Sequence, residues 1–354
     1  MITKQIDENS VALIAEESDD LFTLRRVIRR GDKLIGDTTR AVKQDKDFAR
    51  PDKGERIRIR VALDVEKVSI DDVVDRLRVQ GTISESDSES VSKGSHHSMT
   101  LMIDEPVTLV KKSWADLERR LIFGKRDHGS FLLVAVDTSD CGIGRLNGTH
   151  LKIMPNLYSG ASVKRYKSTF NSTFNIEHFF VDVSTAIMSL IRERDQIIIF
   201  GPGETKRRLA NFLSQIPNCK GYKIQVIDGI DSSGEDGIYV FVKSETMKQA
   251  LAKSKIAKVS SILDEIMRRV NKKNNKFTMG FDETSKANEA GAVESVVFSD
   301  KIFEKHDEDT VIEFLNQAEA KGVEVYAVDS TTDIGLRVSS LGGIVSLLRF
   351  SPFG

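Results

Sequence analysis

Short runs of alternating apolar and polar residues dominate the N-terminal part of the chain. The runs cover residues 10–15, 21–27, 56–65, 75–83 and 98–103. A period of two places successive side chains on opposite faces of an extended chain, so each run predicts a strand with one buried face. Clusters of Gly, Asp, Ser and Lys separate the runs and are typical of turns. The pattern predicts a small antiparallel β-domain, a partly closed barrel.

The pattern changes after this domain. Residues 114–122 predict a helix, with Ser113 as its expected N-cap and Gly124 at its end. Residues 131–137 then form a near-continuous apolar run, which is typical of a strand buried on both faces. Helical patterns at 176–194 and 204–215 alternate with apolar strands at 196–200 and 223–227. This alternation predicts a central α/β domain.

The last part of the chain repeats the alternation of helices and strands. Helices are expected at residues 259–274, 283–289, 309–321 and 334–341, and extended segments at 277–280, 294–298, 324–328 and 343–350. They predict an α/β sandwich of about 100 residues. We therefore expect a multi-domain α+β and α/β protein with domains at residues 1–127, 128–255 and 256–354.

Composition narrows the classes of function. The chain of 354 residues carries 52 Lys and Arg against 53 Asp and Glu, a net charge of −1, so any contact with RNA must come from local patches. Cys141 and Cys219 have no neighbouring Cys or His at metal-binding spacing, which argues against a disulfide framework or a zinc site. The charged N-terminus and the lack of an apolar run of about 20 residues predict a cytoplasmic protein without a membrane span.

Residues 36–65 combine a polar, basic segment with a strand whose arginines alternate with apolar residues. Period two places Arg56, Arg58 and Arg60 on one face of that strand. The preceding loop has mixed charge, so binding to phosphate would depend on a few of its side chains: Thr38, Thr39, Arg40, Lys43 and Lys46. The alternative interpretation is a solvated β-hairpin with an arginine-rich edge.

Three further segments carry candidate chemistry. Glu16, Glu17, Asp19 and Asp20 form an acidic cluster that could hold a divalent cation, although consecutive acids in a turn are usually a solvated loop. A cationic loop contains Lys164, Arg165 and Lys167 around Tyr166 and suits RNA, with a mobile surface loop as the alternative. The turn of Pro202, Gly203 and Glu204 lacks the spacing of a phosphate cradle, which favours contact with a protein.

Over its full length the chain resembles the Pelota family, the archaeal and eukaryotic ribosome-rescue factors related to class-1 peptide release factors. The resemblance is carried by GDTTRAVKQDKD before RIRIRVALDVEKV, by LRVQGTISESDSESVSKGSHHSMTL followed by VTLVKKSW, and by KANEAGAVESVVFSD with GGIVSLLRF. It implies an N-terminal Sm-like β-barrel, a central α/β domain and a third domain of the type shared with kink-turn-binding ribosomal proteins.

The resemblance also implies a function in mRNA surveillance. Such a factor enters the empty A site of a stalled ribosome with a translational GTPase of the elongation-factor type, and it splits the subunits with a recycling ATPase. The loop that matches residues 38–46 reaches the decoding centre and the mRNA channel, so Arg40 and Lys43 are the expected RNA contacts. A monomer that needs no cofactor for binding is expected.

Two features of this sequence modify what the resemblance implies. Release factors position the hydrolytic water with Gly-Gly-Gln, which is absent here, so neither peptide release nor reading of a stop codon is predicted. Pelota proteins usually have Pro-Gly-Phe at the turn that contacts the GTPase, where this chain has Pro202, Gly203 and Glu204. The alternative function is a divalent-metal-dependent endoribonuclease that cleaves stalled mRNA in no-go decay, with the acidic cluster at Glu16–Asp20 as its weak candidate site.

Overall fold

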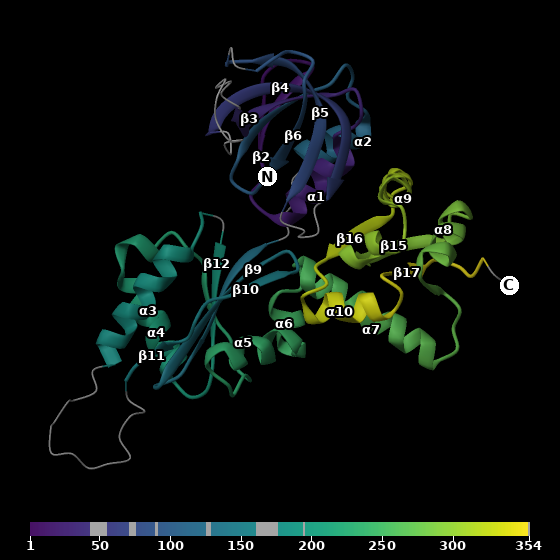
Figure 1. Cartoon of the computed structure of the whole chain (residues 1–354). Coiled ribbons are helices and arrows are strands. Elements are labelled where there is room, and N and C mark those ends of the chain that lie inside the picture. Colours follow the sequence, from purple (N-terminus) through teal and green to yellow (C-terminus); the bar gives the residue numbers. More distant parts are fainter. Residues whose placement is uncertain are drawn as a thin grey trace, which may run out of the picture. The chain divides into compact units, whose positions relative to one another are not determined.

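The computed structural model describes residues 1–42, 55–70, 76–88, 91–124, 129–160, 176–193 and 195–352. The chain divides into two compact units, residues 1–126 with 303–325 and residues 127–302 with 326–354. They contain an antiparallel N-terminal sheet, a mixed central sheet and a mixed C-terminal sheet (Figure 1). Because each of the three sheets has its own set of helices, the protein is a three-domain α+β protein.

The N-terminal sheet is antiparallel throughout, as the alternating pattern predicted. Its strands are β1 (Ile2–Gln5), β2 (Ser10–Ile14), β3 (Lys33–Val42), β4 (Glu55–Ile70), β5 (Leu77–Ser86), β6 (His96–Leu101) and β7 (Pro106–Val110). Their order across the sheet is β1-β2-β7-β3-β4-β5-β6. Along β5, Leu77, Val79 and Ile83 are buried and the residues between them are not, so the period of two marks the core face.

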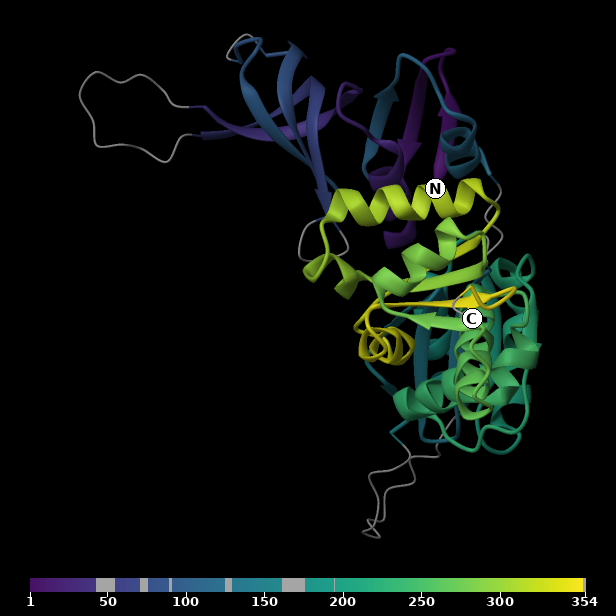
Figure 2. The ribbon, with the colours of Figure 1, turned by 90° about the vertical axis from the view of Figure 1, so that its right-hand side faces the viewer.

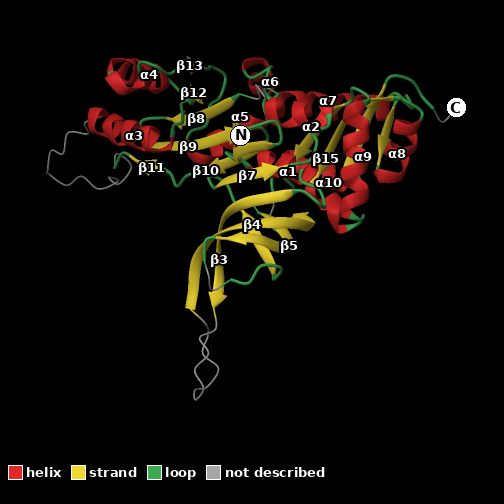
Figure 3. Cartoon of the chain, turned by 90° about the horizontal axis from the view of Figure 1, so that it is seen from above, coloured by secondary structure: helices red, strands yellow, loops and turns green. Residues whose placement is uncertain are grey.

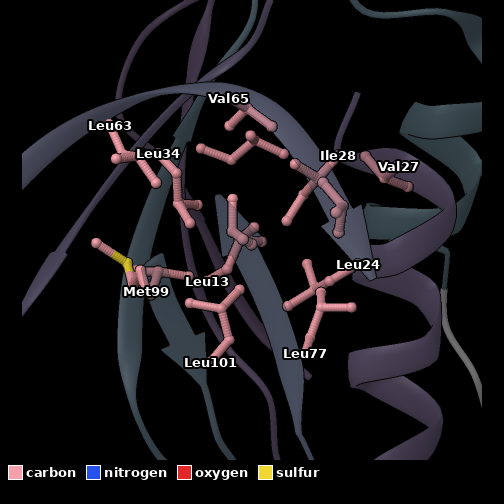
Figure 4. Packing of buried hydrophobic residues seen from close by; sticks show 14 of the residues in the cluster. Leu13, Leu24, Val27, Ile28, Leu34, Leu63, Val65, Leu77, Met99 and Leu101 are labelled. Carbon is pink, nitrogen blue, oxygen red and sulfur yellow. The ribbon is translucent and has the colours of Figure 1, made fainter. Parts of the chain in front are cut away.

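Helix α1 (Ser18–Val27) packs its apolar side chains against this sheet, as Figure 4 shows. The prediction of a strand at residues 21–27 is wrong. Leu21, Leu24 and Val27 are buried at helical spacing, and the arginines between them are buried as well. Arg25 and Arg26 form ion pairs with α9 (Glu308–Ala320), which belongs to the same unit. Burial of charged residues on α1 hid the helical period.

A buried polar cluster joins the end of β7 to helix α2 and to the segment before β3. The ammonium group of Lys111, just after β7, donates to Asp32 Oδ2 at 2.6 Å and to the carbonyl of Val27 at 2.8 Å. Glu118 of helix α2 (Asp116–Phe123) lies 3.4 Å from the same ammonium group. The helix begins after Ala115, whose amide donates to Glu118, so the prediction of Ser113 as the N-cap is wrong.

The central sheet has helices on both faces (Figure 1). Its strands are β8 (Ser130–Val136), β9 (Asp140–Asn147), β10 (His150–Ile153), β11 (Leu157–Tyr158), β12 (Asp195–Phe200) and β13 (Ile224–Val226). Its helices are α3 (Ile176–Leu190), α4 (Thr205–Gln215), the short 3-10 helix η2 (Pro217–Cys219), α5 (Gly234–Lys243) and α6 (Glu245–Ala250). Strand β12 pairs parallel with β8 and β13, while β9 pairs antiparallel with β8.

Alternate residues of β8 enter two different cores. Leu133 and Ala135 pack with α5, and Leu132 and Val134 pack with the helices on the opposite face. The prediction of a strand buried on both faces is therefore confirmed. Helix α5 was not predicted, because its acidic, Gly-rich start resembles a turn.

The C-terminal part contains a sheet of order β14-β17-β15-β16. Its strands are β14 (Phe277–Met279), β15 (Val293–Ser299), β16 (Glu324–Val328) and β17 (Ile344–Leu348). The helices are α7 (Lys255–Asn271), α8 (Phe281–Glu289), the 3-10 helix η3 (Asp300–Glu304), α9 and α10 (Asp333–Ser340). The predicted order of helices and strands is confirmed. Among the described residues, no helix is long and apolar enough to cross a membrane.

A hydrogen bond between His150 and Asp329 joins the central sheet to the C-terminal sheet within one unit. His150 Nδ1 of β10 lies 3.1 Å from Oδ2 of Asp329, just after β16. The hydrogen bond from His150 lowers the pKa of Asp329, burial opposes this effect, and bonds from Thr331 reinforce it, so the pKa is about 2. A carboxyl whose pKa is depressed on folding stabilises the folded state above its unfolded pKa, and this contribution is lost as the pH falls through the folded value.

We expect Asp329→Asn to lower the free energy of unfolding at pH 7 by about 2 kcal/mol. The unmodified protein should lose a similar amount as the pH falls from about 4 to about 2, and the variant should lose correspondingly less. Urea unfolding over a pH series measures both effects. Asp333→Asn is the matched control, because Asp333 is half exposed and pairs with Lys243 on the surface. Equal acid dependence of the variant and the unmodified protein would contradict the assignment.

Candidate functional site

Strands β3 and β4 form a long two-stranded ribbon at one end of the N-terminal sheet. They pair without interruption from Lys33 opposite Asp64 to Val42 opposite Glu55. Only residues 33–36 of β3 also pair with β7, and only residues 61–70 of β4 also pair with β5. Beyond those positions the two strands pair with each other alone, and Figures 2 and 3 show them projecting from the sheet.

Three of the candidate residues expected in a loop lie in β3 instead. Thr38, Thr39 and Arg40 pair with Ile59, Arg58 and Ile57 of β4. The prediction that the loop begins at residue 38 is therefore wrong. Lys43 and Lys46 lie outside the described residues. The ribbon gives Arg40 a fixed position near its outer end, which a loop would not provide.

The period of two in β4 is confirmed. Arg56, Arg58 and Arg60 are exposed, whereas on the opposite face Ile57 is half-buried and Ile59 and Val61 are buried. Asp37 of β3 offsets part of this charge, because its carboxylate lies 3.0 Å from Nη2 of Arg58 and 3.6 Å from Nη1 of Arg60. The arginine face is thus partly neutralised at its base. No ion pair of Arg56 occurs among the described residues.

Side chains near the start of β6, the edge strand of the same sheet, form hydrogen bonds to the ribbon. Thr38 Oγ1 lies 3.0 Å from Nε2 of His97, and Arg40 Nη1 donates to Oγ of Ser95 at 3.0 Å. Burial lowers the pKa of His97, and the positive charge of Arg40 lowers it further, which favours the neutral imidazole. Ser95 and His97 were not predicted as site residues. Their only sequence signal is their place in the segment GSHHSMTL, which carries the family resemblance.

The acidic cluster lies at the start of α1 rather than in a turn. Glu17 is the N-cap of the helix, and Asp19 and Asp20 are buried in its first turn. The α-ammonium group of Met1 lies 2.8 Å from Oε2 of Glu16 and 2.7 Å from Oδ2 of Asp20. Two of the four acids are therefore already paired with a cation.

The Met1 ammonium group is held electrostatically by this cluster. Burial lowers the pKa of the α-amine, but hydrogen bonds to Asp20 and Glu16 outweigh the burial and raise it overall. Within the described part of the chain, no group of three or more His, Cys, Asp or Glu side chains is arranged to hold a metal ion. The cluster stabilises the start of the first helix.

The turn between β12 and α4 is rigid and exposed. Gly201 and Gly203 have φ angles of 132° and 62°, and a Cβ atom on Gly201 would lie 2.2 Å from the carbonyl oxygen of Val136. The buried ammonium group of Lys206 donates to the carbonyls of Gly201 and Gly203 at 2.8 and 2.9 Å. A cation therefore already caps the turn from inside, and Gly203 and Glu204 are exposed on its outer side.

Glu204 stands on the outer side of this turn. Its side chain is 72% exposed and pairs with Nη1 of Arg207 at 2.6 Å, and Arg207 also contacts Asp228. The residue that replaces the usual aromatic thus belongs to a charged surface patch. The cationic loop with Lys164, Arg165 and Lys167 lies outside the described residues.

Comparison with known proteins defines the class of protein first. The model of the Pelota N-terminal domain matches residues 1–123, and the model of eRF1 domain 3 matches residues 256–352. A β-domain with a projecting ribbon thus precedes a domain that matches eRF1 domain 3. The crystal structure of the Thermoplasma acidophilum Pelota protein, 22% identical, covers 99% of this chain and 100% of its own chain with a TM-score of 0.63, a likeness of fold.

Full-length relatives identify the family. A protein pelota homolog of Nitrosopumilus maritimus (strain SCM1) is 60% identical over 351 residues, 99% of each chain. The protein pelota homolog of Cenarchaeum symbiosum (strain A) is 46% identical over 354 residues, 99% of this chain and 100% of its own. The chain belongs to the Pelota family.

We expect Lys206→Met to destabilise the folded protein by about 2 kcal/mol, since the hydrogen bonds of a buried charged donor are lost. The carbonyl groups of Gly201 and Gly203 would lose their internal partner, so the turn should also become more sensitive to proteolysis. Urea unfolding and limited proteolysis measure the two effects. Arg208→Met on the exposed face of α4 is the control and should change neither. A stable turn in the Lys206 variant would contradict the role of this ammonium group.

Proposed function

We propose that the protein is a ribosome-rescue and mRNA surveillance factor. It recognises a stalled ribosome with an empty A site and promotes dissociation of the subunits together with a translational GTPase and a recycling ATPase. Membership of the Pelota family over the full length supports this function. The observation that carries it is the β3–β4 ribbon, because its uninterrupted register holds Arg40 near an end that projects from the sheet.

The proposal assigns roles to the candidate residues. Contact with ribosomal RNA and mRNA is assigned to the outer part of the ribbon and to the loop beyond it, namely Thr38, Thr39, Arg40, Lys43 and Lys46, with Arg56, Arg58 and Arg60 as the cationic support. The central loop with Lys164, Arg165 and Lys167 is a further RNA contact. The turn of Pro202, Gly203 and Glu204 contacts the GTPase. These contacts need no cofactor, and the absence of Gly-Gly-Gln leaves no group for peptide release.

The proposal includes finer features of the fold. We infer an Sm-like barrel at residues 1–127, because Thr38 and Arg40 of β3 bond to His97 and Ser95 near β6, the edge strand. A central domain follows at residues 128–255, and a sandwich of the kink-turn-binding ribosomal protein type follows at residues 256–354. A monomer in the cytoplasm fits a factor that enters one ribosomal site.

Replacement of Arg40 and Lys43 tests the function. We expect Arg40→Ala together with Lys43→Ala to reduce splitting of ribosomes with an empty A site at least about tenfold, since each lost contact of a cation with phosphate contributes about 1 kcal/mol or more. Subunit dissociation is measured with the GTPase and the ATPase present. Lys4→Ala with Lys112→Ala, two exposed lysines of the same unit, removes equal charge and should not slow splitting. Unchanged splitting by the Arg40 and Lys43 variant would overturn the assignment.

The alternative function, a metal-dependent endoribonuclease, has weaker support. The pairing of Met1 with Glu16 and Asp20 gives these carboxylates a structural role, and a nuclease would need them free to bind Mg²⁺ or Mn²⁺. This pairing favours the non-enzymatic adaptor.

Neutralisation of the acidic cluster tests the alternative. We expect purified protein not to cut single-stranded RNA with Mg²⁺ or Mn²⁺, since two of the candidate carboxylates are paired. Gel analysis of labelled RNA measures cleavage. Glu17→Gln with Asp19→Asn leaves the pairs with Met1 intact and is compared with the unmodified protein. Cleavage that needs metal and disappears in this variant would establish the nuclease in place of the adaptor.

A further inference from the structure

The end of α7 and the turn after it carry a dense group of cations. Residues 268–276 read RRVNKKNNK, with five Lys and Arg and no acid. Every residue from 270 to 276 is exposed. In a chain with a net charge of −1, this segment is a strong local excess of positive charge.

Helix termination explains only part of this charge. Cations are favoured in the last turn of a helix, where they complement the helix dipole, and Arg268 and Arg269 occupy that turn. Glu265 offsets both of these arginines, because its carboxylate accepts hydrogen bonds from each. Lys273 and Lys276 lie beyond the helix, so the dipole does not account for them.

Lys273 stands at the position that ends helix α7. Its φ angle is 54°, in the left-handed region that a glycine or asparagine usually occupies after a helix. In this conformation the amides of Lys273 and Asn274 donate to the carbonyls of Val270 and Arg269 and close the helix end. Lysine costs more energy here than the usual glycine, and it differs from glycine by its long, charged side chain.

The turn is rigidly anchored to the C-terminal sheet. Arg269 Nη1 donates to the carbonyl of Leu348 at 3.1 Å, and the amide of Leu348 donates to the carbonyl of Lys276 at 3.1 Å. The amide of Asn274 donates to the carbonyl of Arg269 at 2.9 Å. These bonds place the turn beside the end of β17, so the residues that follow β17 belong to the same surface.

Arg349 and Phe350 follow β17 and extend this surface. Arg349 is exposed, and Phe350 is 47% exposed, so its ring is open to solvent beside these cations. Among the described residues, no ion pair involves Lys272, Lys273, Lys276 or Arg349. The neighbouring strand β15 has one exposed acid, Glu294, which follows Val293, the residue paired with Leu348. We call the four cations and Phe350 the cationic turn.

We propose that the cationic turn binds RNA, with its lysines and Arg349 on the phosphate backbone and the ring of Phe350 on an unpaired base. Exposed lysines beside an aromatic ring suit RNA, because ammonium groups pair with phosphates while a ring stacks on any base. Exposed amides at Asn271, Asn274 and Asn275 add donors and acceptors for phosphate and the 2′-hydroxyl. On the proposed function, the RNA is ribosomal, and the cationic turn is a second contact far along the chain from the β3–β4 ribbon.

The test neutralises three lysines in the full chain: Lys272→Gln, Lys273→Gln and Lys276→Gln. All three side chains are exposed, so the fold should be retained. Affinity is measured for a short RNA stem-loop with unpaired loop bases, and separately for vacant archaeal ribosomes, over a series of KCl concentrations. We expect the triple variant to bind the stem-loop about tenfold more weakly at low salt. The slope of log affinity against log salt should fall by about 2, since each lost phosphate contact removes about 0.7–0.9.

Two controls separate local contact from overall charge. Lys253→Gln, Lys258→Gln and Lys286→Gln remove the same charge from other exposed positions and should leave the affinity and the slope unchanged. Phe350→Ala should weaken binding of the stem-loop but not of a fully paired duplex, because only unpaired bases offer a free face for stacking.

The outcomes distinguish this proposal from the function on which it rests. An unchanged salt slope in the triple variant overturns the cationic turn as an RNA site. Loss of ribosome affinity with unchanged stem-loop affinity also overturns it, since the partner would then be a ribosomal protein. If the unmodified protein binds the stem-loop through these lysines but does not bind ribosomes, the proposed function fails and the RNA site stands.

Discussion

The antiparallel pairing of β3 with β4 is the constraint on which the N-terminal unit and its proposed activity depend. At Gly36, β3 passes close to Val107 and Met99, where a Cβ atom would lie 3.2 and 3.3 Å from their side chains. Beyond that point the strand has only β4 beside it. An isolated two-stranded ribbon is marginally stable in water, so the outer part needs contacts of its own. Thr38 and Arg40 supply them through His97 and Ser95.

The same register decides which side chains the ribbon presents. A slip of one residue would turn Arg56, Arg58 and Arg60 toward the core and Ile57 and Ile59 toward water. Burial of Ile59 and Val61 prevents such a slip, and Asp37 pairs with the arginines only in the observed register. Apolar packing at the base of the ribbon thus fixes the position of cations at its outer part.

Sequence patterns predicted the elements whose periods follow from burial on one face or on both. Strand β8 and the alternating face of β4 were found because their side chains enter cores formed by nearby elements. Helix α1 was missed, because Arg25 and Arg26 are buried by ion pairs with α9, almost 300 residues later in the chain. The position of Thr38 in a strand was missed too, since the strand's outer part has no apolar face. Long-range polar contacts leave no local period.

Some residues of the candidate site could likewise be predicted from the sequence, and others could not. The arginines of β4 and the exposed turn at Gly203 could be inferred from spacing and from residue type. The role of Lys206 inside that turn could not, because its burial depends on how β12 meets α4. The pairing of the acidic cluster with Met1 likewise depends on the fold of the whole sheet.

Positive charge is concentrated in small surfaces of the chain rather than spread over the whole protein. The chain as a whole is nearly neutral, so it has no general attraction to RNA that would hold it on every message in the cell. Among the described residues, Arg56 and the cations of the cationic turn form no ion pairs, while Asp37 and Glu265 neutralise neighbouring arginines. On both proposals, the β3–β4 ribbon and the cationic turn each contribute part of the affinity for RNA, and the contributions combine when one RNA contacts both. Local charge, rather than total charge, then sets the affinity.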